Sequence, residues 1–264
     1  MSPSSLTIAA TQTLRRLAEQ DPDANHLAAA LRHLAKWRSE LVTNTLVARS
    51  GTMVLSGPFR GMDYALHAAE GSGSARLLGV YEASLAPVIE VIIARAYPVV
   101  VDIGCAEGYY AVGLARRMPA SRILARDESQ KAQDLCRRLA DLNAVGDRVQ
   151  VGGRMDHADL AICAAQKTLI LCDIEGAEAE LLDPVAAPAL AKADILVECH
   201  DVMRPGLTAL LADRFAATHH VTRIDRQIDA NLPPWMEELS DLDRLIALWE
   251  WRGGPTPWLW MQSR

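Results

Sequence analysis

One segment constrains the possible fold of this chain more than any other. In it, a run of β-branched residues leads straight into a glycine-containing turn and then a helix. The segment covers residues 99–119 and reads VVVDIGCAEGYYAVGLARRMP. Its first three valines suit a parallel strand that is covered on both faces. Gly104 and Gly108 leave the turn nearly free of side chains, so a ligand can approach the backbone and the first N–H groups of the helix. The segment therefore predicts a binding joint for a nucleotide-like cofactor.

The composition of the turn narrows the kind of ligand. A dinucleotide-binding turn needs the pattern G-x-G-x-x-G, which is absent here. The chain has D-x-G-x-x-x-G instead, from Asp102 to Gly108, with Glu107 inside the turn. An acidic residue at this point disfavours an anion and suits a ligand that carries an ammonium and a sulfonium. S-adenosylmethionine is such a ligand.

The segment resembles motif I of the class I S-adenosylmethionine-dependent methyltransferases, and later segments resemble the FkbM-type branch of that superfamily. The chain departs from the motif at Ala106, where many members have glycine. The resemblance implies a Rossmann-like fold with the cofactor seated in this turn. The residues that it places at the cofactor are Asp102, Gly104, Cys105, Ala106, Glu107 and Gly108.

An acidic position follows the next expected strand. Asp127 stands where a carboxylate is expected to accept hydrogen bonds from the two ribose hydroxyls of a cofactor. It also suits the first turn of the following helix, whose dipole favours acids, and both interpretations can hold. The family resemblance places the adenine in the loop 153–156. Arg154 and Asp156 are therefore candidates there, with Asp156 as an acceptor for the adenine amino group.

Three carboxylates follow the expected strand 168–172, in the sequence DIEGAE. This element resembles the D-x-E-G-x-E element of FkbM-type enzymes. Asp173, Glu175 and Glu178 are expected at the carboxyl edge of the sheet, where open parallel sheets bind ligands. Acids in a first helical turn are also ordinary capping chemistry. We favour a role beside the reacting methyl group for Asp173.

Glu198 and His200 follow the expected strand 193–197 and emerge at the same edge as Asp173. In one interpretation His200 is a general base that takes the proton of a substrate hydroxyl. In another, Asp173, Glu198 and His200 share a divalent cation such as Mg²⁺, which orients the hydroxyl and lowers its pKa. In a third, His200 only binds a neighbouring loop. Spacing alone does not choose among them.

A further short segment, GVYE, precedes the valine run. It resembles the G-x-Y-E segment that comes before motif I in these methyltransferases. The resemblance implies that Tyr81 and Glu82 lie near the methionine end of the cofactor, with Glu82 accepting from its amino group. The alternative is a helix start with an acid near its N-terminus.

The chain divides into an amino-terminal helical cap and loop, residues 1–80, and an expected cofactor-binding domain, residues 81–264, with an insertion at 228–254. A leucine-rich amphipathic helix in the first part must rest on the sheet domain or on a second copy, which makes a homodimer one interpretation. Tryptophans and Arg252 make the insertion a candidate substrate wall or dimer contact.

The expected fold is α/β: a seven-stranded, mostly parallel Rossmann-like sheet with helices on both faces, plus the amino-terminal helical extension. The last two strands are expected to pair as an antiparallel edge. The expected strands are 99–101, 122–125, 149–151, 168–172, 193–197, 219–224 and 257–261.

Composition excludes some classes of function. The 264 residues are 50% hydrophobic and 23% charged, which suits one large domain with an appendage. The net charge of −6 disfavours a nucleic-acid substrate. Five cysteines without a C-x-x-C pair indicate small apolar fillers in a reducing compartment. We expect no membrane span and a cytoplasmic location.

These patterns together predict an S-adenosylmethionine-dependent methyltransferase that transfers the methyl group to a hydroxyl of a small molecule. Three alternatives stay open: an N-methyltransferase on the same fold, an NAD-dependent oxidoreductase, and a non-catalytic protein that binds the cofactor. The missing dinucleotide pattern and Glu107 disfavour the oxidoreductase.

Overall fold

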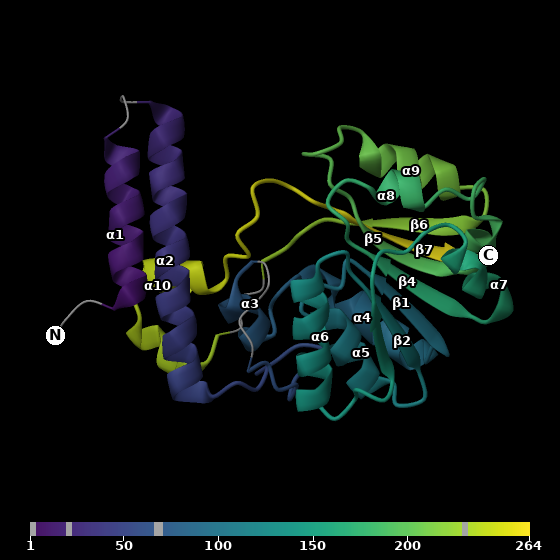
Figure 1. The fold of residues 1–264 in the computed structure, drawn as a ribbon, viewed down its shortest axis with the longest axis horizontal. Helices are drawn as coiled ribbons and strands as arrows, with labels where there is room; N and C mark the ends of the chain where they lie inside the picture. The colour runs from purple at the N-terminus through teal and green to yellow at the C-terminus, as the bar shows by residue number, and fades with distance from the viewer. Residues whose placement is uncertain (1–3, 20–22, 66–70, 229–231) are drawn as a thin grey trace.

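A seven-stranded sheet in the order β3-β2-β1-β4-β5-β7-β6 forms the centre of the molecule (Figure 1). The computed structural model describes residues 4–19, 23–65, 71–228 and 232–264. β7 is antiparallel to both of its neighbours and the other pairs are parallel, which confirms the predicted mixed sheet. The strands are β1 (Val99–Ile103), β2 (Arg122–Arg126), β3 (Val149–Gly152), β4 (Thr168–Cys172), β5 (Asp194–Glu198), β6 (His219–Ile224) and β7 (Trp258–Ser263).

Helices cover both faces of the sheet, as the uninterrupted apolar strands require. In β1, Val100 faces one core, while Val99 and Val101 face the other. The helices α4 (Ala86–Arg95), α5 (Tyr109–Arg117) and α6 (Gln130–Leu142) lie over the first core. The second core is covered by α7 (Ile162–Ala165), α8 (Glu178–Leu181) and α9 (Leu207–Phe215).

The strand order reverses beside β1, because β2 and β3 lie on one side of it and β4 and β5 on the other. All five strands are parallel, so their carboxyl ends meet at one edge of the sheet. Open α/β sheets bind their ligands in the crevice at such a reversal. The topology therefore fixes where a site is to be sought.

Two long helices form a hairpin beside the sheet (Figure 1): α1 (Ser5–Ala18) and α2 (Ala24–Ser50). The hairpin is joined to α10 (Asp241–Ala247) by a two-pronged ion pair in which Nε and Nη2 of Arg38 each lie 2.6 Å from an oxygen of Asp243. Near the end of α2, Leu46 is fully buried, but Leu27 and Leu31 are 72% and 70% exposed. The sequence predicts that the apolar face of this helix is covered. In the structure it is covered only in the carboxyl-terminal part of α2.

The glycine-rich segment between α2 and α3 (Gly73–Leu78) is expected from the sequence to be a long connection, and it packs into the core instead of lying free. Phe59 and Tyr64 are buried, and both rings contact the edge of Tyr109. Residues 66–70 lie outside the described part of the chain. The remaining short elements are the 3₁₀ turns η1 (Ala83–Leu85), η2 (Asp159–Ala161), η3 (Pro188–Lys192) and η4 (Pro234–Glu238).

No membrane span is expected from the sequence, yet within the described residues the stretch Gly73–Arg95 is long and apolar enough to cross a membrane by composition. The structure breaks this stretch into two helices at Gly79, whose φ is +77°. It also carries two buried charged residues, Arg76 and Glu82. Its apolar side chains belong to the core that includes β1, so composition alone is weak evidence for a span here.

The first residue of β5 anchors the far end of the sheet. Asp194 is 3% exposed and accepts from the Tyr97 hydroxyl, from Arg95 Nη1 at 2.8 Å and from the Ser263 backbone N–H at 2.8 Å. Burial alone would raise the pKa of Asp194, but these donors outweigh it and lower the pKa. A lowered pKa in the folded state gives stability above the unfolded pKa, which is lost as pH falls through the folded value.

We expect Asp194→Asn to lower the free energy of unfolding by about 2 kcal/mol at pH 7, because it removes charged hydrogen bonds. The difference from the unmodified chain should shrink below about pH 4, as the wild-type carboxylate becomes protonated. Urea denaturation at pH 7 and at acid pH measures both. Asp147→Asn, at an exposed carboxylate paired with Arg148 at 3.4 Å, is the control and should change little. If the loss in free energy of unfolding were the same at both pH values, the ionised carboxylate of Asp194 would not be its cause.

Candidate functional site

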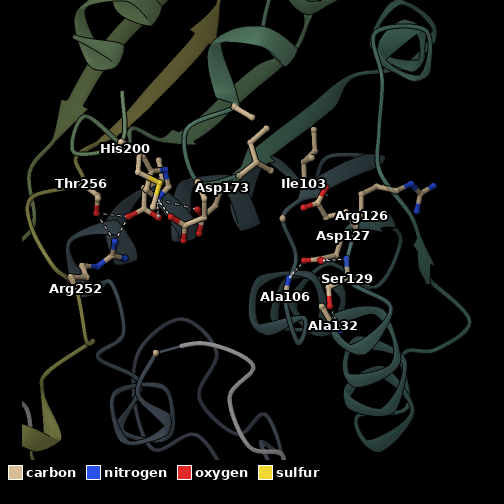
Figure 2. Close-up of a pocket in the computed structure, with 18 of the residues that line it drawn as sticks. Ile103, Ala106, Arg126, Asp127, Ser129, Ala132, Asp173, His200, Arg252 and Thr256 are labelled. Atoms are coloured by element: carbon tan, nitrogen blue, oxygen red, sulfur yellow. Dashed lines mark hydrogen bonds and ion pairs between the residues drawn. The ribbon is translucent and has the colours of Figure 1, made fainter. Parts of the chain in front are cut away.

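A cavity of about 1250 Å³ follows the carboxyl ends of the five parallel strands (Figure 2). Its volume is enough for a cofactor and a second small molecule. Figure 2 shows two groups of polar side chains in it, one around Asp127 and one around Asp173 and His200. The strand ends contribute Ile103 and Gly104 from β1, Asp127 from β2, Arg154 and Asp156 from β3, Asp173 and Glu175 from β4, and Glu198 and His200 from β5.

The turn after β1 is held against its neighbours by its backbone. The N–H groups of Gly104 and Cys105 donate to the Arg126 carbonyl at 2.8 and 3.0 Å. Gly104 has φ +83°, and a Cβ atom there would lie 1.6 Å from the carbonyl oxygen of Asp173. Only glycine fits this position, because both the left-handed conformation and the close approach exclude a side chain.

Asp127 connects the turn to the next helix. Its Oδ2 accepts from the Ala106 N–H at 3.0 Å, and its Oδ1 accepts from the Ser129 N–H at 2.8 Å. Ala106 has φ +46°, so the position where many motif I sequences have glycine is left-handed here, at a cost of about 1 kcal/mol for an alanine. Each Asp127 oxygen has a second lone pair, and the residue lines the cavity, which suits two hydroxyl donors.

The structure brings most of the predicted cofactor residues to the cavity and leaves others out. Those that line it are Tyr81, Gly104, Ala106, Asp127, Arg154, Asp156 and Asp173. Those that do not are Glu82, Asp102, Cys105, Glu107 and Gly108. Asp102 is 1% exposed inside β1, and burial raises its pKa to about 7.

Glu107 differs most from its expected position. It is fully buried, accepts from the Tyr64 hydroxyl at 2.5 Å and lies 3.0 Å from Nε of Arg76. A buried carboxylate needs such partners, and both come from the segment before β1. The acid of the turn therefore points into the protein and not toward a ligand, in contrast to the expectation.

Glu82 is likewise occupied by protein partners. It is 4% exposed, and its carboxylate accepts from the Tyr110 hydroxyl and from Nη2 of Arg252. Burial, together with the nearby Glu198, raises its pKa to about 8. The adjacent Tyr81 does line the cavity, with the Arg76 guanidinium 4.0 Å from its ring centre.

His200 is oriented by a buried acid. Its Nδ1 lies 2.7 Å from Oε1 of Glu178, a fully buried carboxylate that also accepts from the Gly176 N–H at 3.1 Å. Burial acts to lower the pKa of His200, but the Glu178 hydrogen bond and the surrounding carboxylates outweigh it and raise the pKa. The proton on Nδ1 is thus held by Glu178, which leaves Nε2 for the cavity.

Three groups around that nitrogen could hold a cation. Within the described residues, one ligand atom from each of Asp173, Glu175 and His200 lies within 4.8 Å of the others. Nε2 of His200 is 3.5 Å from Asp173 Oδ1 and 3.3 Å from Glu175 Oε2. Burial and the neighbouring Glu198 raise the pKa of Asp173. These three candidate cation ligands differ from the three predicted from the sequence, because Glu175 takes the place expected for Glu198.

Arg252 explains the position of Glu198. Its Nη1 donates to Glu198 and its Nη2 to Glu82, while Nε binds Oε2 of Glu250 at 2.9 Å. The Thr256 hydroxyl also donates to Glu198, at 2.5 Å (Figure 2). The sequence indicated a substrate wall or a dimer contact for Arg252 and gave no sign of its ionic role. The one available signal was an arginine directly after Trp251 in a tryptophan-rich insertion.

No family model matches this chain. A release factor glutamine methyltransferase from Chlorobaculum tepidum is 40% identical over 53 residues, which is 20% of this chain and 18% of that protein. The match therefore spans under a fifth of the relative's length.

Solved structures resemble the chain over most of its length. A human methyltransferase 10 domain containing protein aligns with a TM-score of 0.50 at 11% identity, over 87% of this chain and 97% of that one. An O-methyltransferase from Bacillus cereus in complex with SAH aligns at 0.49 and 14% identity, over 86% and 90%. The O-methyltransferase TomG from Streptomyces achromogenes aligns at 0.46 and 13%, over 67% and 81%. At such identities the likeness shows the Rossmann-like fold alone.

We expect Gly104→Ala to lower the free energy of unfolding by about 3 kcal/mol, because the new Cβ combines a left-handed backbone with a collision against the Asp173 carbonyl. Gly51→Ala is a matched control: φ is +76° there, and a Cβ would meet nothing within 4 Å. The control should cost about 1 kcal/mol. Chemical denaturation measures both, and equal losses would show that the close approach is unimportant.

Proposed function

We propose that this chain is an S-adenosylmethionine-dependent methyltransferase that methylates a hydroxyl of a small molecule. The observation that carries the proposal is one cavity at the sheet reversal. At one end it has the Asp127-held turn, and at the other it has a histidine among carboxylates. The names of the aligned solved structures agree with this reading. The finer assignment to the FkbM-type branch rests on the D-x-E-G-x-E element alone.

The residues present fit this cofactor. The carboxylates of Asp127, Asp156 and Asp173 line the cavity and suit the ribose hydroxyls, the adenine amino group and the cationic methionine end in turn. Glu107 is engaged with Arg76, so the acidic character of the site comes from the strand ends. When bound, S-adenosylmethionine supplies a methyl group made electrophilic by the positively charged sulfur.

His200 then has a definite task in the transfer. As the acceptor oxygen approaches the methyl carbon, Nε2 of His200 takes the hydroxyl proton, while Glu178 stabilises the imidazolium through Nδ1. The methyl group would pass from the sulfur to the acceptor oxygen, and the released proton would stay on Nε2 of His200. Holding the acceptor in line supplies much of the rate.

A divalent cation on Asp173, Glu175 and His200 is the second way to lower the pKa of the acceptor hydroxyl. Two carboxylates and one imidazole are ligands that Mg²⁺ or Mn²⁺ accepts. In that arrangement Nε2 of His200 binds the cation and is no longer a base. The two roles exclude each other, so they can be separated by experiment.

Other features complete the proposal. The net charge of −6 favours a small-molecule acceptor over a nucleic acid. The exposed Leu27 and Leu31 of α2 are the surface through which we propose a homodimer. The five cysteines are buried and unpaired, which agrees with a reducing, cytoplasmic location.

We expect S-adenosylhomocysteine to bind the purified chain, and Asp127→Ala to weaken this binding about 10- to 100-fold, because a carboxylate that accepts from the ribose is lost. Asp134→Ala, on the exposed face of α6, is the control and should bind as the unmodified chain does. Isothermal titration with S-adenosylhomocysteine and with NAD compares the two cofactor classes directly. Tight NAD binding, or no binding of S-adenosylhomocysteine, would refute the proposal.

We expect His200→Ala and Glu175→Gln each to weaken Mn²⁺ binding about 10-fold or more if the cation role is right, since each removes a ligand. Glu180→Gln serves as the control, because that exposed side chain pairs with Arg204 outside the cluster. Titration followed by electron paramagnetic resonance of free Mn²⁺ gives the affinity without any acceptor. If the unmodified chain binds no Mn²⁺, the cation role is excluded and the base role is retained.

A further inference from the structure

The amino-terminal hairpin contributes positive charge to the cavity. Arg32 and Lys36 lie one turn apart on α2, and both line the cavity. Within the described residues, neither is joined to a carboxylate by an ion pair, although the chain as a whole is acidic. The strand ends supply the groups suited to the cofactor, and these two cations come from a separate element of the cavity wall.

Trp251 is fixed between this helix and the rest of the cavity. Its backbone has φ +68°, which is strained for a bulky residue and persists only when neighbours hold it. Its Nε1 donates to the Ser39 hydroxyl at 3.2 Å, and Nζ of Lys36 lies 4.8 Å from its ring centre. Helix α2 thus holds both an aromatic ring and a cation at the cavity wall.

Apolar side chains extend this wall from the sheet side. Val202 and Met203 follow β5, line the cavity and are 64% and 61% exposed. They follow His200 by two and three residues, and Nε2 of His200 lies among the carboxylates of the same cavity, 3.3 Å from Glu175. The acceptor half of the cavity therefore offers three chemically different surfaces: a proton acceptor, an apolar wall and a pair of cations.

Resting on the proposed methyl transfer, we propose that the acceptor is an anionic small molecule. Its carboxylate or phosphate group binds Arg32 and Lys36, its apolar part lies against Trp251, Val202 and Met203, and its hydroxyl reaches His200. Lys36 keeps hydrogen-bond donors for the anion while it lies over the Trp251 ring. Specificity for the charge of the acceptor thus depends on helix α2. This helix supplies none of the strand-end residues proposed for the cofactor.

Three probes with one common ring test the charge requirement: phenol, 4-hydroxybenzoate and 4-hydroxyphenyl phosphate. Each is titrated by calorimetry into the chain saturated with S-adenosylhomocysteine. We expect at least one anion to bind about 10-fold more tightly than phenol, because two partly exposed charge pairs are added. The tighter of the two anions identifies the charged group, and added salt should reduce the preference.

The double variant Arg32→Gln with Lys36→Gln should bring the anions to within about 2-fold of phenol, while S-adenosylhomocysteine binds unchanged. Arg15→Gln with Arg16→Gln, on the exposed end of α1 and outside the cavity lining, should keep the preference. Equal binding of all three probes, binding of none, or a preference that survives the double variant overturns the inference. Loss of S-adenosylhomocysteine binding in the unmodified chain would instead refute the proposed function.

Discussion

The close approach of two backbone turns at the sheet reversal determines where every candidate residue lies. Gly104 and Asp173 follow adjacent parallel strands, and their backbones meet at a distance that leaves no room for a Cβ. The Arg126 carbonyl holds the same turn from the other side. Because three strand ends are joined in this way, Asp127 and Asp173 open onto one cavity. The site is therefore set by backbone geometry first and by side chains second.

An excess of buried and half-buried carboxylates shapes the electrostatics of the cavity around His200. Arg252 compensates for Glu82, Glu198 and Glu250, and the cluster around His200 adds further acids. Burial and mutual repulsion raise the pKa of Glu82 and of Asp173. Such a region gains stability from any bound cation, whether a metal ion or the positive centre of a cofactor. The same field would repel an anionic acceptor, which is why a separate cationic wall is needed for one.

The strands and their order follow from local pattern, but the partners of single side chains do not. β4 and β6 match the predicted ranges: β4 is an apolar run covered on both faces, whereas β6 is a partly exposed edge strand. Glu107 lies away from its expected place and Glu198 has an unforeseen partner, since Tyr64 and Arg252 lie 43 and 54 residues away from them. Spacing along the chain carries no information about such contacts. The left-handed Ala106 could be anticipated, because the motif's glycine marks the backbone conformation and not the side chain.

The sheet and the elements outside it line different parts of the cavity. This explains why the sequence says least about the proposed acceptor. Strand ends repeat one geometry wherever this fold occurs, so the motifs place Gly104, Ala106 and Asp127 at the cavity, although Asp102 and Glu107 do not line it. The proposed acceptor wall is assembled from α2, from the segment around Trp251 and from the residues after β5, and the hydrogen bond from Trp251 to Ser39 joins the first two. None of these pieces forms a site alone. The packing of the hairpin against α10, together with the contact of Trp251 with Ser39, brings the cations of α2 to the same cavity as His200, so the proposed acceptor choice would depend on contacts outside the strand ends.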